Sequence, residues 1–183
     1  IDFYDVKADV EALLGLGGTH DYRFEADTCE ALHPGQSARI YIDGKAVGWL
    51  GILHPSLTQA VELTGNPVVF EVELEAILPA NVAKFAEISK FPSIRRDIAI
   101  IVDEQITAQN VQECVENSAG KLLNKVVLFD MYQGKGIDSG RKSLALGLTL
   151  SDSSRTLMEE DVEAVLGKVV LALNNKLGAV LRE

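Results

Sequence analysis

The sequence FPSIRRDIAIIVD at residues 91–103 decides the fold class of the second half of the chain. Within residues 97–102, large apolar side chains occupy the even positions, and the odd positions hold Asp, Ala and Ile. The segments at 123–132 and 142–150 alternate in a similar way. Alternation with a period of two residues predicts strands, so these three segments should pair into one sheet.

Helical patterns separate these strands. Residues 108–118 carry apolar side chains at helical spacing, and Thr107 precedes them as a candidate N-cap. The sequence TLME at 156–159 predicts a capping box and a second helix that runs to about residue 177. A last strand is expected at 179–182. The order β-α-β-β-α-β indicates a ferredoxin-like split βαβ fold, with four antiparallel strands and both helices on one face.

The first half predicts an antiparallel sheet with peripheral helices. Its strongest signal is the pair Asp43-Gly44, which suits a tight two-residue hairpin turn. The expected segments are a helix around residues 6–14, strands at 22–26, 37–42, 46–53 and 68–74, and a helix at 55–63. A connection follows, with a boundary near 84–89. We therefore expect an α+β chain of two domains, a module at 1–86 and a ferredoxin-like domain at 87–183.

Alternation also predicts one open face on the second domain. The leucines of 142–150 should meet the helices, which leaves Ser143 and small neighbours on the opposite face. Ala99 shares that face. We assign Phe129 to the core, and this places Asp130 and Tyr132 outward. A flat floor of small residues with one aromatic ring and one carboxylate can hold a nucleobase by stacking and edge contacts.

Basic residues near this face are candidates for phosphate contacts. They are Arg95, Arg96, Lys135, Arg141 and Lys142. Each could equally be a solvated loop charge, and Arg155 is expected to pair with Asp152 or to cap a turn. The whole outer face could instead pack on another domain or subunit.

Composition limits the other classes of function. The net charge is −10, but residues 1–88 hold 5 basic and 14 acidic residues, and residues 89–183 hold 12 and 13. The second half is therefore close to neutral, which is compatible with a modest RNA surface. No run is long enough for a membrane helix. Two cysteines without metal spacing favour a reducing, cytoplasmic location. The three histidines suit turns better than a metal site, so we expect no metal and no catalytic residue.

Taken in order, these blocks resemble the C-terminal part of bacterial phenylalanyl-tRNA synthetase beta chains. The second-half segments, with FDMY at 129–132, KSLA at 142–145 and RTL at 155–157, look like its ferredoxin-fold anticodon-binding domain. The sequences LHPG at 32–35 and GWLGILHP at 48–55 look like the preceding module, a synthetase-like domain without catalysis.

The resemblance implies a function for the residues on the open face. Asp130, Tyr132 and Ser143 would contact the first anticodon base of phenylalanine tRNA, and Ala99 would lie near the third. The parent enzyme would attach phenylalanine to tRNA with ATP and Mg²⁺, as a heterotetramer of two alpha and two beta chains. Its active site would lie in the alpha chain, and its editing and magnesium segments would precede residue 1.

The chain begins at Ile1, and we expect a fragment of a longer protein with no cofactor, DNA or membrane partner of its own. The alternative function is a ferredoxin-like protein-interaction or small-ligand regulatory domain that uses the same open face.

Overall fold

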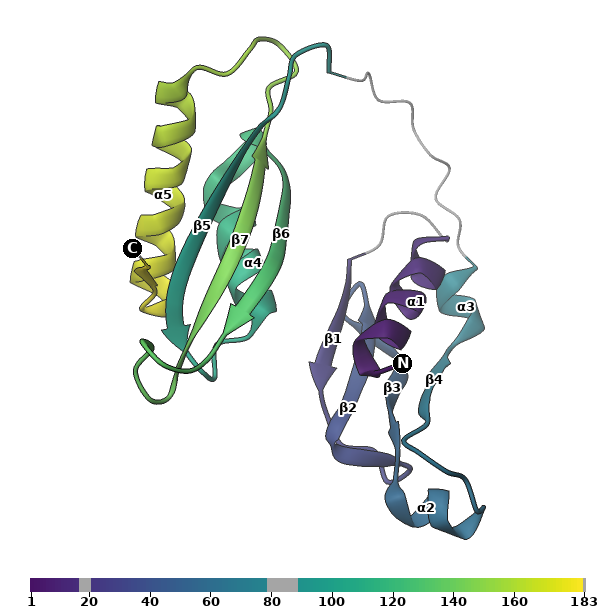
Figure 1. Cartoon of the computed structure of the whole chain (residues 1–183). Coiled ribbons are helices and arrows are strands. Elements are labelled where there is room, and N and C mark those ends of the chain that lie inside the picture. The colour runs from purple at the N-terminus through teal and green to yellow at the C-terminus, as the bar shows by residue number, and fades with distance from the viewer. Residues whose placement is uncertain (17–20, 79–88, 183) are drawn as a thin grey trace. The chain divides into compact units, whose positions relative to one another are not determined.

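The computed structural model describes residues 1–16, 21–78 and 89–182 (Figure 1). Contacts divide the chain into two compact units, Ile1–Phe85 and Ala86–Glu183. These are called unit 1 and unit 2 below. Each contains a four-stranded sheet in which all paired strands are antiparallel. The predicted α+β fold class is therefore confirmed.

Unit 1 is a sheet with its strands in sequence order, β1-β2-β3-β4. Its elements are α1 (Phe3–Gly15), β1 (Tyr22–Ala26), β2 (Leu32–Ile42), β3 (Lys45–Leu53), α2 (Pro55–Ala60), β4 (Val68–Val72) and α3 (Leu74–Ile77). The predicted hairpin is confirmed, with Asp43 and Gly44 at φ of 48° and 78° between β2 and β3. The predicted last strand is two residues too long, because Leu74 begins α3 instead.

A small core joins α1 to this sheet. Val10 and Leu14 on α1 and Ile40 and Leu50 on the strands are at most 1% exposed. The helix begins at Phe3, three residues before the expected range, and the carboxylate of Asp2 accepts hydrogen bonds from two backbone N–H groups of its first turn.

Gly48 allows a close approach between β3 and β4. A Cβ atom at this position would lie 2.0 Å from the carbonyl oxygen of Glu71. The clash would be with backbone, which cannot rotate away as a side chain can. The two strands can lie this close only because residue 48 is a glycine.

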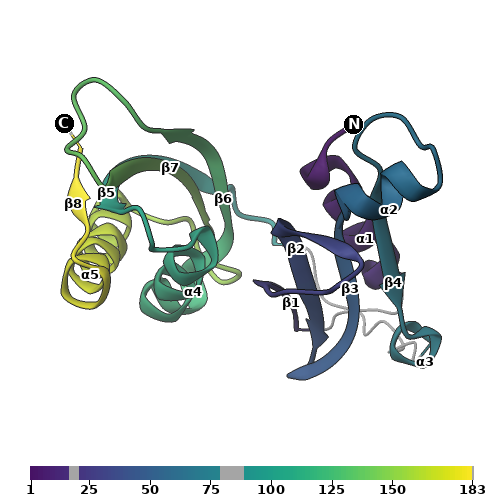
Figure 2. The same ribbon diagram turned by 90° about the horizontal axis from the view of Figure 1, so that it is seen from below.

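Unit 2 has the predicted ferredoxin-like order. Its elements are β5 (Ile94–Asp103), α4 (Ala108–Ala119), a 3-10 turn (Gly120–Leu122), β6 (Leu123–Tyr132), β7 (Arg141–Leu150), α5 (Glu159–Leu177) and β8 (Val180–Leu181). The strands lie in the order β6-β7-β5-β8, and α4 and α5 lie on the same side of the sheet (Figure 2). Among the described residues, no helix is long and apolar enough to cross a membrane.

The core of unit 2 fills the space between the sheet and the two helices. Leu144, Leu146, Leu148 and Leu150 of β7 are all at most 1% exposed, as their alternation predicts. They pack with apolar side chains of β5, α4 and α5. One face of the sheet is thereby buried against the two helices.

The start of α5 differs from the prediction. The helix begins at Glu159, with Met158 as its N-cap, so the box expected from Thr156 is wrong. The carboxylate of Asp161 instead accepts the Met158 N–H at 2.9 Å and two guanidinium N–H groups of Arg155 at 2.6 and 2.8 Å. These hydrogen bonds lower the pKa of Asp161 to about 2. The expected pairing of Arg155 with Asp152 is present at 3.8 Å.

Candidate nucleic-acid interface

The face of the unit 2 sheet opposite α4 and α5 is the candidate interface, called the outer face below. It carries the residues of β5 and β7 that alternate with the core-facing ones. Ala99 pairs with Ala145, and Ile101 pairs with Ser143. Both helices of this unit lie on the other side of the sheet (Figure 2). The centre of the outer face is therefore a floor of small side chains, with Ile101 as the one large residue among these four.

The four predicted site residues lie together on this floor. Asp130 of β6 is paired with Ala145, which is paired in turn with Ala99 on β5. Tyr132 is paired with Ser143 in the next cross-strand row on the same face. Rows two residues apart along a strand are separated by about 7 Å, close enough for one short RNA segment to touch both.

Tyr132 supplies an accessible ring at the end of β6. Its side chain is 39% exposed. Its hydroxyl donates a hydrogen bond to the backbone carbonyl of Lys135 at 3.2 Å. Gly134 lies against the hydroxyl end of the ring, since a Cβ atom there would be 3.0 Å from the hydroxyl oxygen. The loop after β6 thus contacts the ring edge, which favours a fixed ring orientation.

Phe129 does not lie in the core, and this prediction is wrong. The register of β6 against β7 shifts between Leu128 and Asp130, so Phe129 is the extra residue of a β-bulge. The bulge breaks the strict alternation. Phe129 is 50% exposed, and the guanidinium carbon of Arg95 lies 5.6 Å from the centroid of its ring. The outer face therefore presents a second aromatic ring.

Arg182 is a neighbour of the site that sequence reasoning missed. Its Nη1 atom donates to the hydroxyl of Ser143 at 3.3 Å, and its guanidinium carbon lies 5.4 Å from the Tyr132 ring centroid. Its backbone N–H donates to the carbonyl of Ala99 at 2.9 Å. One residue after β8 thus contacts three of the four predicted site residues. No local pattern could have indicated this, because it depends on the pairing of β8 with β5.

Three of the five candidate phosphate contacts differ in their surroundings. Arg95 lies on the outer face, where its Nε atom is 2.8 Å from Asp97. Arg96 points the other way and binds both carboxylate oxygens of Glu159 at 2.6 and 2.7 Å. Lys135 is exposed in the loop after β6. Only Arg95 of these three is fixed on the outer face by the strand register.

The other two candidates hydrogen-bond to backbone carbonyls. Arg141 donates to the carbonyls of Ile101 and Gly178 at 3.0 and 3.1 Å. Lys142 donates to the carbonyl of Glu104 at 2.8 Å, and its register partner is the core residue Val102. Their cations are therefore used within the protein, and the structure does not gather the five candidates into one patch.

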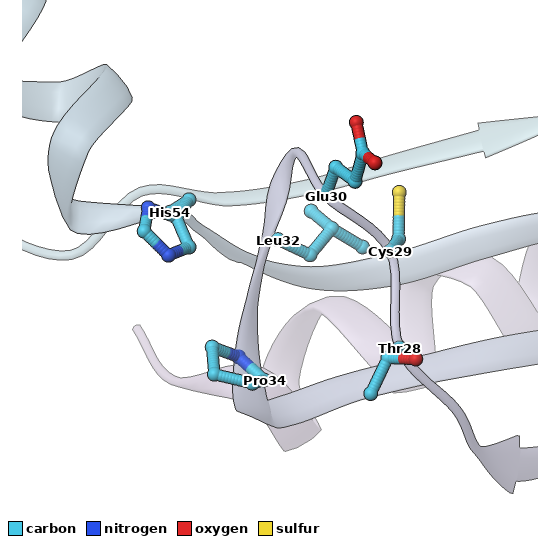
Figure 3. A pocket seen from close by; sticks show the side chains of 6 residues that line it. All are labelled: Thr28, Cys29, Glu30, Leu32, Pro34 and His54. Carbon is cyan, nitrogen blue, oxygen red and sulfur yellow. The ribbon is translucent and has the colours of Figure 1, made fainter.

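Unit 1 contains a shallow pocket beside the β2–β3 hairpin (Figure 3). Its lining residues are Thr28, Cys29, Glu30, Leu32, Pro34 and His54. His54 is the N-cap of α2, and its Nδ1 atom accepts the Ser56 N–H at 3.2 Å. Among residues 1–16, 21–78 and 89–182, no group of three or more His, Cys, Asp or Glu could hold a metal.

Two family models match the chain. The model described as "Ferredoxin-fold anticodon binding domain" matches residues 89–182, and the model described as "Phenylalanyl tRNA synthetase beta chain CLM domain" matches residues 1–74. Since the first match covers more than half of the chain, the chain belongs to the family of ferredoxin-fold anticodon binding domains.

Curated relatives agree with this assignment over the whole chain. The chain is similar to phenylalanine–tRNA ligase beta subunits from Coxiella burnetii (47% identity), Pseudomonas putida (46%) and Methylococcus capsulatus (43%). Each alignment covers 100% of this chain and 23% of the relative. The chain thus spans about a quarter of the length of these relatives, and the predicted resemblance is confirmed.

Proposed function

We propose that the outer face binds the anticodon of phenylalanine tRNA. The observation that carries this proposal is the register of β5, β7 and β6, which gathers Ala99, Asp130, Tyr132 and Ser143 in two adjacent rows of one face. These are the residues for which the resemblance implies anticodon contacts. Family membership supports the same function for this unit.

Each group on the face has a chemical part in this proposal. The small floor lets a base approach the backbone, and the Tyr132 ring supports it by stacking. The exposed Asp130 carboxylate accepts hydrogen bonds from the N–H groups of a base edge. The Ser143 hydroxyl can donate or accept. Stacking together with edge contacts is how single-stranded loops of RNA are read.

The remaining roles follow from the similarity to ligase beta subunits. We infer that residues 1–86 are the C-terminal portion of a non-catalytic synthetase-like module that contacts other parts of the enzyme. Residues 87–183 are the anticodon-binding domain. The complete enzyme joins phenylalanine to its tRNA in the cytoplasm, as two alpha and two beta chains. Its ATP and Mg²⁺ act at the alpha chain's active site.

The test is binding of the anticodon stem-loop by the complete ligase, assembled from full-length chains. Tyr132→Ala should raise Kd by a factor of about 5–150, because stacking on an aromatic ring is worth about 1–3 kcal/mol per base. The matched control is Tyr4→Ala, which removes an exposed tyrosine from unit 1. This control should leave Kd unchanged. Raising the salt concentration should weaken binding of the wild-type enzyme.

Equal affinity and equal aminoacylation rates for the Tyr132→Ala and wild-type enzymes would refute the assignment of this face. A protein-interaction or small-ligand domain would then be the better explanation, and its binding should show little dependence on salt.

A further inference from the structure

The Arg182 side chain occupies the space in which the proposed anticodon base would lie. Its guanidinium donates to the Ser143 hydroxyl and lies over the Tyr132 ring at 5.4 Å. Ser143 is only 4% exposed. A base can therefore reach that hydroxyl and that side of the ring only after the guanidinium has moved.

The side chain is free to make such a move. Arg182 is exposed, and among the described residues it has no carboxylate partner. Its backbone, in contrast, is fixed by the hydrogen bond to Ala99 and by the pairing of β8 with β5. The charge is thus anchored beside the site on a long side chain, and it is held there only by a neutral hydroxyl and a ring.

Four of the five other basic residues near the site already have partners, and the fifth, Lys135, is exposed in the loop after β6. Arg95 is paired with Asp97 and Arg96 with Glu159. Arg141 and Lys142 bind backbone carbonyls, as described above. Arg182 is therefore a cation next to Tyr132 that can exchange weak internal partners for a phosphate without breaking an ion pair.

We propose that Arg182 is an RNA-binding residue of the outer face. It leaves Ser143 and Tyr132 when a base enters, and it then contacts a backbone phosphate of the nucleotide that stacks on Tyr132. This inference rests on the proposed anticodon function and adds a phosphate-binding residue to it. In the absence of RNA, the same guanidinium covers the ring and the hydroxyl.

The test measures binding of the anticodon stem-loop to the complete ligase at several salt concentrations. Arg182→Ala should weaken binding about 5–10-fold in 0.1 M salt, because one phosphate contact is lost. The slope of log affinity against log salt should become shallower by about 0.7, the value for one contact to single-stranded RNA. Arg182→Lys should keep the slope. Lys168→Ala removes an equal charge from an exposed position on α5, and it should change neither the affinity nor the salt slope.

Tyr132→Ala, measured alongside, separates the two proposals. Weakening by both Tyr132→Ala and Arg182→Ala supports both. Weakening by Tyr132→Ala alone overturns the role of Arg182 and leaves the anticodon site in place. Tighter binding by Arg182→Ala also overturns it, because the side chain would then only obstruct. If neither variant changes binding, the anticodon site and the role of Arg182 are both refuted. Unfolding midpoints of all variants verify that folding is intact.

Discussion

Replacing Phe129 by alanine should lower the free energy of unfolding of unit 2 by about 1.5–2 kcal/mol. Full burial of a phenylalanine stabilises a protein by about 1.5–3 kcal/mol, and here half of the ring stays in water, which leaves about 1 kcal/mol. The guanidinium of Arg95 beside the ring adds about 0.5–1 kcal/mol. A phenylalanine in the core would cost about 3–5 kcal/mol on the same substitution.

Urea unfolding of the chain, monitored by hydrogen exchange in peptides from β5 and β7, measures the loss of unfolding free energy in unit 2. Leu146→Ala is the matched control, because Leu146 is 0% exposed on the same sheet and its truncation should cost about 2–5 kcal/mol. Fluorescence of Trp49, the one tryptophan of the chain, reports on unit 1 and should have the same midpoint in both variants. A loss of 3 kcal/mol or more for Phe129→Ala would show that the ring is a core residue and that the bulge is misplaced.

Three further predictions concern other features. Gly48→Ala should destabilise unit 1 by at least about 2 kcal/mol, since its Cβ would meet backbone of the next strand, and the Trp49 midpoint should fall. A Cβ atom at Gly15 would meet open space, so Gly15→Ala should change the free energy of unfolding of unit 1 by less than about 0.5 kcal/mol. The carboxylate of Asp161, with its pKa lowered to about 2, stabilises the fold above pH 4, and this contribution should be lost as the pH falls from 4 to 2. Asp161→Asn should abolish that part of the pH dependence of unfolding, and an unchanged profile would contradict it. Ala145→Leu should fill the floor and weaken stem-loop binding about 10-fold or more while costing under about 1 kcal/mol of stability. Undiminished binding would show that RNA does not use the floor.

Much of the fold could be predicted from local patterns. Asp43 and Gly44 adopt the positive φ angles that a tight turn needs, and Thr107 caps its helix as expected. The leucines at alternate positions of β7 are buried because a strand turns successive side chains to opposite faces. Asp130 and Tyr132 also lie on the outer face, but the premise from which this was predicted, Phe129 in the core, is wrong.

The failures share a physical cause, since each depends on contacts that sequence spacing does not contain. Phe129 escapes the alternation because a bulge adds one residue to β6. Thr156 has the right chemistry for a cap, yet the carboxylate of Asp161 accepts the N–H of the N-cap residue Met158 and is itself held by Arg155. Arg182 reaches the site from the position directly after a two-residue strand at the far end of the sequence.

The bulge has a consequence for solubility as well. Strand β6 lies at the edge of its sheet, and Val127, Phe129 and Met131 on it are all more than a third exposed. A straight edge strand of this composition would be a template for pairing with another chain and for aggregation. The extra residue at Phe129 interrupts the regular spacing of N–H and C=O groups, so an incoming strand cannot pair in one register along the whole edge. The irregularity that exposes an aromatic ring therefore also protects the edge from self-association.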